Sequence, residues 1–305
     1  MVYIDNRPSL IQKIGLGTAQ FGSPYGIANK EGKILESEAA KILNFAWDQG
    51  VNTLDTAAAY GDSEDVLGRF LVKSGFNYRV VSKAPALNVG NVNTFGDQLN
   101  ATLVRLRQKK IYGYLIHKFD DIKEYESLLN ELQKSKKEEL VEKIGFSLYR
   151  VEELQYLLDR KIAFDLLQVP YNIFDQRFAG HFQALKSKGV EIHVRSAFLQ
   201  GLFFLKVDEL SQQMHAARGN LKKLQTISAE LDIPISHLCL CFVLLNPYLD
   251  KVIIGVNSLT QLRQNLGFTN YIQKMNEIYD QCKGLDIEDE QVILPFLWEQ
   301  VSPLR

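Results

Sequence analysis

The amino-acid sequence predicts an α/β fold in which eight parallel strands, each followed by a helix, close into a (β/α)8 barrel. Short apolar or β-branched runs alternate from end to end with segments whose apolar residues recur at helical spacing. No Pro-, Gly- or Ser-rich linker divides the 305 residues, and a barrel of this kind commonly occupies about 250 residues as one unit. We therefore expect residues 1–305 to form a single domain.

Strands are expected at short runs of apolar or β-branched residues. Each run contains between three and six residues, which lies within the usual range of strand lengths. In chain order the predicted strands cover residues 14–18, 51–55, 79–83, 111–116, 143–146, 165–169, 190–195 and 252–254.

Between the strands, apolar residues recur every three or four positions, which gives each predicted helix one apolar face. Candidate N-caps are Ser37, Asp62 or Ser63, Ser236, and Asn257 or Ser258. The barrel core is expected over residues 14–268, with a C-terminal helical extension over residues 270–305. The clearest helical patterns are Ala39, Ile42, Leu43 and Ala46; Val151, Leu154, Leu157 and Leu158; and Leu221, Leu224, Ile227 and Leu231.

The composition excludes several classes of function. With 46% hydrophobic and 23% charged residues, the chain resembles a globular protein with a large core. Its formal net charge of −1 argues against nucleic acid or an anionic membrane as a partner. The N-terminus lacks the pattern of a secretion signal, and no run reaches the roughly 18 apolar residues of a membrane helix. We therefore expect a cytoplasmic protein.

The three cysteines have neither the spacing of a disulfide framework nor that of metal ligands. Cys239 and Cys241 lie in an apolar segment and Cys282 stands alone, so all three are expected to be small buried hydrophobic residues. The histidines outside the predicted strand ends lack a second ligand at helical spacing. The sequence thus predicts no metal site.

Ionisable residues stand at the ends of three successive predicted strands. Asp55 ends the second strand, Lys83 ends the third and His117 follows the fourth, while Tyr60 lies in the loop after the second. Because the C-terminal ends of parallel strands meet at one mouth of a barrel, these side chains should converge. Each has a structural alternative, such as a rim ion pair or loop packing. Their occurrence on consecutive strands favours a catalytic site.

Together the four side chains suit proton donation to a carbonyl oxygen. A free tyrosine has a pKa of about 10, and a Lys83 ammonium held by Asp55 is expected to lower the pKa of Tyr60. A neutral His117 can donate an N–H to the same oxygen and stabilise the negative charge that develops there. The reducing equivalent must come from a cofactor, because none of these side chains supplies one.

The sequence around these residues resembles the aldo-keto reductase superfamily over nearly the whole length of the chain. That resemblance implies a TIM barrel that transfers a hydride from NADPH, less often NADH, to a carbonyl, with Asp55, Tyr60, Lys83 and His117 as the catalytic residues. The matching stretches are IGLGTAQFG, LDTAAAYGDSEDVLG, VVSK, LIH, IGFS, LQVPYN, RSAFLQG and VIIGVNSLTQLRQNL.

The resemblance also implies a path for the cofactor. The nicotinamide carboxamide would meet Ser147 and Gln168, the pyrophosphate would follow residues 196–201, and the adenosine would rest on residues 255–265. A helix N-terminus after the last strand also suits an anion on physical grounds. The implied cofactor residues are Gly17, Thr18, Asp55, Ser147, Gln168, Arg195, Ser196, Leu199, Gln200, Gly201, Gly255, Val256, Asn257, Ser258, Gln261 and Asn265.

Three positions depart from the family's pattern. Leu148 stands where an Asn commonly binds the carboxamide, and Arg195 stands where many members stack an aromatic ring on the nicotinamide. At the adenosine end the chain has Asn257 and Gln261 in place of a cation, and Arg263 is the nearest one. A 2′-phosphate normally binds such a cation. NADP(H) is favoured by the habit of the family, and NAD(H) stays open.

Two functions follow from the sequence. The leading one is reduction of an aldehyde or ketone, including sugar-like ones, with Tyr60 as general acid. Substrate contacts are expected from Tyr25, Tyr60, His117, Tyr171 and Asn172. The alternative is a regulatory protein that senses nicotinamide nucleotides with little turnover, which the missing carboxamide Asn suggests. The expected partner is a small carbonyl compound, while the oligomeric state is left open.

Overall fold

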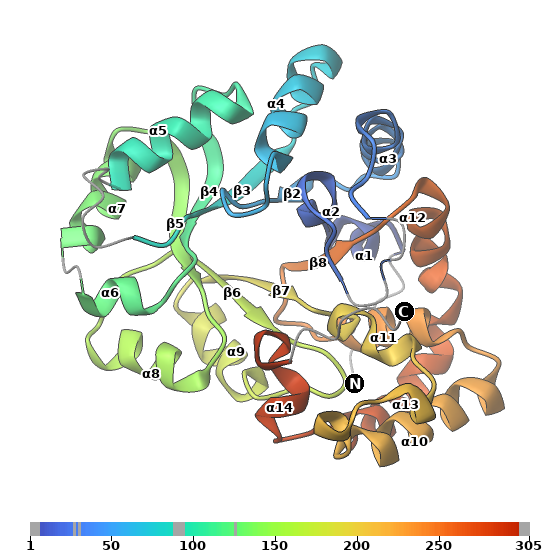
Figure 1. Cartoon of the computed structure of the whole chain (residues 1–305). Coiled ribbons are helices and arrows are strands. Elements are labelled where there is room, and N and C mark those ends of the chain that lie inside the picture. The colour runs from blue at the N-terminus through green and yellow to red at the C-terminus, as the bar shows by residue number, and fades with distance from the viewer. Residues whose placement is uncertain (1–6, 27–28, 30–31, 88–94, 125–126, 299–305) are drawn as a thin grey trace.

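The structure, a computed structural model, describes residues 7–26, 29, 32–87, 95–124 and 127–298. Its eight parallel strands form a closed barrel in the order β1 to β8, so the predicted fold class is confirmed (Figure 1). The strands are β1 Ile14–Gly17, β2 Thr53–Asp55, β3 Arg79–Ala84, β4 Ile111–Ile116, β5 Val141–Ser147, β6 Leu166–Pro170, β7 Glu191–Arg195 and β8 Lys251–Gly255.

Helices surround the barrel and join consecutive strands (Figure 1). The α-helices are α1 Arg7–Gln12, α2 Ala19–Gly22, α3 Glu36–Asp48, α4 Ser63–Ser74, α5 Phe95–Leu106, α6 Asp120–Glu124, α7 Ser127–Lys137, α8 Val151–Asp159, α9 Ala179–Ser187, α10 Ala217–Leu231, α11 Ile235–Leu244, α12 Leu259–Leu266, α13 Ile272–Lys283 and α14 Glu290–Ile293. The 3-10 helices are η1 Leu199–Phe204, η2 Val207–Glu209, η3 Gln212–Met214, η4 Gly267–Tyr271 and η5 Pro295–Leu297.

Two strands begin two residues away from their predicted starts, and the other differences in strand boundaries are of one residue. Strand β2 begins at Thr53, because the Val51 N–H bonds the Ala46 carbonyl and so closes the end of α3 instead of joining the sheet. Strand β5 begins at Val141, two residues early, since Ile111 of β4 pairs with it. Pairing with a neighbouring strand thus decided where each strand begins.

The predicted helix starts were only partly right. Ser258 accepts a hydrogen bond from the Gln261 N–H and caps α12 as expected. Ser37 lies inside α3, and Ser236 lies inside α11, which starts directly after Pro234. The helix starts earlier because the Pro234 carbonyl accepts its first hydrogen bonds, from the His237 and Leu238 N–H groups. Asp62 precedes α4, but its carboxylate bonds Lys33.

The core lies between the barrel wall and the ring of helices. Helix α11 is apolar almost throughout, and nearly all of its side chains are buried. Cys239, Cys241 and Cys282 are free and buried, which confirms their expected packing role. Among the described residues, no single helix is long and apolar enough to cross a membrane. The adjoining helices α10 and α11 reach that length only together, across a 100° bend.

The C-terminal segment packs against the loop that follows β5. Arg150 in that loop pairs with Glu290 of α14 at 3.0 Å, and the rings of Tyr149 and Phe296 meet edge to face. Trp298 is buried and donates its indole N–H to the Val292 carbonyl. The predicted helical extension therefore lies beside the C-terminal mouth of the barrel.

Candidate active site

The ends of β2 and β3 bring a buried ion pair to the C-terminal mouth of the barrel. Lys83 is fully buried, and its Nζ donates to Asp55 Oδ1 at 2.7 Å and to the Thr56 carbonyl at 2.9 Å. Gln168 of β6 donates to the other Asp55 oxygen at 2.7 Å. Burial lowers the pKa of Lys83, and the Asp55 carboxylate opposes that shift. Sharing two oxygens between two donors satisfies the Asp55 carboxylate.

Tyr60 stands above this pair, in the loop between β2 and α4. The Lys83 Nζ lies 5.1 Å from the centre of the Tyr60 ring, and the His117 ring packs edge-on against it with centroids 6.1 Å apart. The structure thus brings together the four residues that the sequence singled out.

The pKa of Tyr60 departs from the sequence expectation. Burial raises it, the Asp55 charge raises it further, and the positive charge of Arg195 lowers it. The Lys83 ammonium, which is shared with Asp55 and the Thr56 carbonyl, does not outweigh the effect of burial. The net lowering of the Tyr60 pKa expected from the sequence is therefore wrong. Tyr60 carries its proton throughout the neutral range and can donate it.

His117 is uncharged at neutral pH. Burial and the nearby charges of Lys83 and Arg195 lower the pKa of His117 to about 3. A neutral imidazole keeps one N–H, so His117 can donate a hydrogen bond without adding a charge to the mouth.

The shifted His117 should make stability depend on pH. Unfolded His117 takes up a proton near its ordinary pKa of about 6.5, whereas the folded protein resists it down to about 3. The unfolded state binds more protons between these values, so this contribution to stability is complete above pH 6.5 and falls as the pH drops. Urea unfolding at pH 7 and pH 5 should show a smaller loss in His117→Asn than in the wild type. The exposed-site variant His215→Asn should keep the wild-type response, and an equal loss in all three would contradict the assignment.

A close backbone contact fixes the loop that carries Tyr60. A Cβ added to Gly22 would lie 1.7 Å from the Tyr60 carbonyl oxygen, and one added to Gly61 would lie 2.3 Å from the Gly22 carbonyl. Gly61 also has a φ of +56°, which glycine adopts without strain. Ser63 ties the same loops together by donating to the Thr18 carbonyl at 2.8 Å. Sequence reasoning missed this pair, since its only signal is a glycine in each of two distant motifs.

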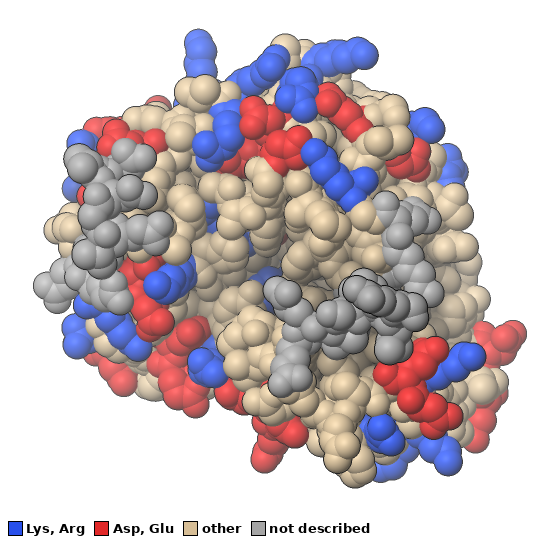
Figure 2. Space-filling model, viewed as in Figure 1, with Lys and Arg blue, Asp and Glu red and all other residues tan. Residues whose placement is uncertain are grey.

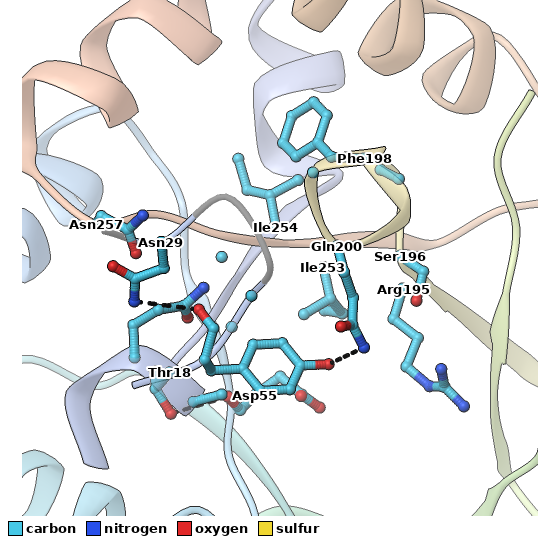
Figure 3. Close-up of a pocket in the computed structure, with 18 of the residues that line it drawn as sticks. Thr18, Asn29, Asp55, Arg195, Ser196, Phe198, Gln200, Ile253, Ile254 and Asn257 are labelled. Carbon is cyan, nitrogen blue, oxygen red and sulfur yellow. Dashed lines mark hydrogen bonds between the residues drawn. The ribbon is translucent and has the colours of Figure 1, made fainter. Parts of the chain in front are cut away.

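A groove leads away from Tyr60 across the mouth of the barrel. Figure 2 shows a hollow at the centre of this face, with charged side chains mostly around its periphery. The expected residues that line it are Gly17, Thr18, Tyr25, Asp55, Tyr60, Arg195, Ser196, Gln200, Gly201, Gly255, Asn257 and Gln261. The sequence missed Ala19, Gln20, Gly26, Asn29, Ala197, Phe198, Phe204, Ile253 and Ile254, several of which appear in Figure 3.

The loop after β7 forms one side of the groove in an unusual backbone conformation. Ser196, Leu199 and Gln200 have φ values of 63°, 43° and 51°, and Gly201 has a φ of 101°. Positive φ values are rare for residues other than glycine, and they occur most often at functional sites. Gln200 also donates to the Tyr25 hydroxyl at 3.0 Å, so the loops after β1 and β7 meet over the groove (Figure 3).

The far end of the groove lies at the start of α12. Asn257 donates its N–H to the Gln261 side chain at 2.7 Å, and Leu259 donates its N–H to the Glu38 carboxylate at 3.0 Å. Asn257 Oδ1 is buried and has no hydrogen-bond partner among the described residues. This end of the groove therefore offers an unused acceptor beside a carboxylate.

Two expected substrate residues point elsewhere. Tyr171 is buried between Phe182 of α9 and Phe242 of α11, because its side chain faces the helices and not the barrel mouth. Asn172 is buried, and its Oδ1 accepts from two backbone N–H groups of its own loop while its Nδ2 donates to the Ser196 carbonyl. Asn172 thus shapes the loop after β6 and supports Ser196.

Six expected cofactor residues do not line the groove. Ser147 and Gln168 bond one another beneath Asp55, so neither side chain opens directly onto the groove. Ser258 caps α12, and its hydroxyl is used there. The side chains of Leu199, Val256 and Asn265 are buried and do not line the groove. Leu199 and Val256 are apolar and pack in the core.

Arg195 lies at the Tyr60 end of the groove. Its guanidinium carbon is 3.9 Å from the centre of the Tyr149 ring, and its Nη2 donates to the Leu148 carbonyl at 3.1 Å. Within the described part of the chain, Arg195 makes no ion pair with a carboxylate. In the same part of the chain, no three His, Cys, Asp or Glu residues are arranged to hold a metal ion.

The sequence model of the aldo/keto reductase family matches residues 13–287. The chain belongs to this family. An L-galactose dehydrogenase from Arabidopsis thaliana is 23% identical to this aldo/keto reductase over 293 residues, covering 89% of this chain and 88% of the relative. An oxidoreductase of Bacillus subtilis, described as uncharacterized, is 23% identical, and the match covers 93% of this chain and 94% of the relative. The structure of an aldo-keto reductase from Bacillus halodurans is 20% identical in sequence and matches with a TM-score of 0.69. This match covers 89% of this chain and 95% of the other.

Proposed function

We propose that this chain reduces an aldehyde or ketone to an alcohol, using a reduced nicotinamide nucleotide as hydride donor and Tyr60 as proton donor. Membership of the family supports an oxidoreductase of carbonyl compounds. The observation that carries the finer proposal is the meeting of Tyr60, His117 and the Lys83–Asp55 pair at the head of an extended groove.

Each side chain has a definite task in this reaction. The carbonyl oxygen accepts a hydrogen bond from the Tyr60 hydroxyl and another from the neutral His117, so both donors stabilise the negative charge that develops on it. The proton of Tyr60 then passes to that oxygen as the alcohol forms. Lys83 remains charged beside Asp55 and stabilises the phenolate left on Tyr60. The reduced nicotinamide supplies the hydride when bound.

The groove suits an extended dinucleotide. Gly17 and Gly255 present bare backbone on its floor, where a Cβ on Gly255 would lie 2.5 Å from the Gln20 side chain. The unused Asn257 Oδ1 can accept a hydrogen bond from a ribose hydroxyl. The loop after β7 has left-handed residues at Ser196 and Gln200, which both line the groove, and we assign the pyrophosphate to this loop.

We further propose NAD(H) as the nucleotide, in place of the NADP(H) favoured by family habit. The Glu38 carboxylate already accepts from Leu259 at the start of α12, and this hydrogen bond keeps the pKa of Glu38 low. Arg263, the nearest cation in the sequence, stacks over Phe45 at 4.1 Å. A 2′-phosphate at the start of α12 would meet the Glu38 carboxylate instead of a cationic hydrogen-bond donor.

Aromatic side chains around the groove favour a substrate with an apolar portion. The rings of Phe198 and Phe204 pack together at 5.6 Å and both line the groove, and Tyr25 lines it from the loop after β1. Of the four polar residues that suggest a sugar, Tyr171 and Asn172 face away from the groove, while Tyr25 and Arg195 line it. We therefore expect aromatic or medium-chain aldehydes to be reduced better than small hydrophilic sugars.

Calorimetric titration followed by a turnover assay tests this function. NADH should bind more tightly than NADPH, and loss of nicotinamide absorbance should then depend on an added aldehyde. Aromatic aldehydes, medium-chain aldehydes and aldoses form the panel. Binding without turnover for every carbonyl would instead support a nucleotide sensor. Absence of binding by either nucleotide would refute both functions.

A further inference from the structure

The head of the groove carries an uncompensated positive charge. Among the residues that the structure describes, the ionised groups around Tyr60 are the cations Lys83 and Arg195 and the carboxylate Asp55, while His117 is neutral. Lys83 is paired with Asp55 at 2.7 Å, so the charge of Arg195 is left over. Its partners among the described residues are the Leu148 carbonyl and the Tyr149 ring, and neither carries a formal charge.

The fold holds this guanidinium in place. Arg195 is the last residue of β7 and pairs with Pro170 of β6. One face of its planar group lies on the Tyr149 ring, and one N–H is used by Leu148. Figure 3 shows Arg195 next to Ser196 and on the opposite side of the pocket from Asn257. Because Tyr149 covers one face and the side chain lines the groove, its charge acts on whatever reacts beside Tyr60.

The two oxidation states of a nicotinamide differ in charge at the reacting ring. The oxidised ring is a cation, whereas the reduced dihydropyridine is neutral. A ring that delivers a hydride to a carbonyl bonded to Tyr60 must lie at the Tyr60 end of the groove, within the reach of Arg195. Two positive charges about 10 Å apart near a protein surface repel enough to weaken binding roughly tenfold.

We propose that Arg195 selects the oxidation state of the nucleotide, because its unpaired charge repels the oxidised nicotinamide and leaves the reduced form unaffected. This inference rests on the proposed function. In consequence the protein retains the hydride donor and releases the oxidised product readily. Oxidation of alcohols should then require a high concentration of oxidised nucleotide, while reduction proceeds at a low concentration of the reduced one.

Calorimetry with NADH and NAD⁺, without any carbonyl compound, tests the proposal. Wild type should bind NADH at least about tenfold more tightly than NAD⁺. Arg195→Gln should tighten NAD⁺ about tenfold and change NADH by less than about threefold, so the ratio approaches one. Arg195→Lys keeps the charge, so most of the preference for NADH over NAD⁺ should remain. A ratio of two affinities does not depend on what fraction of a variant is folded.

Arg150→Gln is the matched control, because it removes a cation outside the groove, in the ion pair with Glu290. It should leave the ratio of the two affinities at the wild-type value. An unchanged ratio in Arg195→Gln, or an equal loss of affinity for both nucleotides, would overturn the proposal and leave the reductase function intact. Failure of both nucleotides to bind the wild type would instead reject the function itself.

Discussion

Tyr60→Phe is expected to lower kcat by about 10²–10⁴-fold, the usual contribution of a general acid. The phenyl ring can keep its packing against His117 and its place beside Lys83, so only the hydroxyl is lost. Since burial and Asp55 hold the pKa of Tyr60 high, this hydroxyl is protonated across the neutral range and its loss removes a donor at every working pH. Steady-state kinetics and nucleotide titration should show the loss in turnover with unchanged binding.

Tyr25→Phe provides the matched control. The Tyr25 hydroxyl also lines the groove, but it accepts a hydrogen bond from Gln200 and is not placed beside Lys83. Its removal should change KM by no more than about the value of one neutral hydrogen bond, roughly tenfold, with kcat retained. Turnover in Tyr60→Phe near that of the wild type would show that another group donates the proton.

Lys83→Met is expected to destabilise the protein by about 3–5 kcal/mol, since it leaves a buried carboxylate without its cation. The Asp55 side chain is 6% exposed and would retain only the hydrogen bond from Gln168. Turnover should fall as well, because the unpaired Asp55 charge raises the pKa of Tyr60 further. Denaturant unfolding measures the first effect, and kinetics at a temperature where the variant is folded measure the second.

Lys33→Met is the control for this prediction. Lys33 pairs with Asp62 at a similar distance, 2.6 Å, but the two side chains are 42% and 47% exposed. An exposed pair contributes at most about 1 kcal/mol, so this variant should unfold almost as the wild type does. Adding Asp55→Asn to Lys83→Met should recover part of the lost stability, since it removes the unpaired charge. Equal losses in the two single variants would mean that burial of the Lys83–Asp55 pair has no special cost.

The barrel could be predicted because the spacing of apolar residues differs between its strands and its helices along the whole chain. Ile111–Ile116 forms a strand with the predicted boundaries, and Ser258 caps its helix as expected. The start of β2 was misplaced because Val51 is as apolar as a strand residue, yet its N–H closes a helix. Apolar character alone does not distinguish these two uses of a backbone donor.

The candidate site was predictable where chemistry coincides with a strand end. Asp55, Lys83 and His117 were found in this way, because a parallel barrel directs such residues to one mouth. Tyr171 follows a strand too, but one position along the chain decides between the barrel mouth and the helix layer, and its ring faces the helices. Asn29 and Phe198 come from loops, and the sequence of a loop has no regular spacing of apolar residues that would predict its path over the groove.

The contact between Gly22 and Gly61 has a consequence for engineering this barrel. Exchanging the loop after β1 for that of another barrel, in order to change which compounds are accepted, would bring a new backbone against the Tyr60 carbonyl. The segment from Ala19 to Gly22 and the segment from Tyr60 to Ser63 therefore behave as a single cassette. Chimeras should transplant both segments from the same parent.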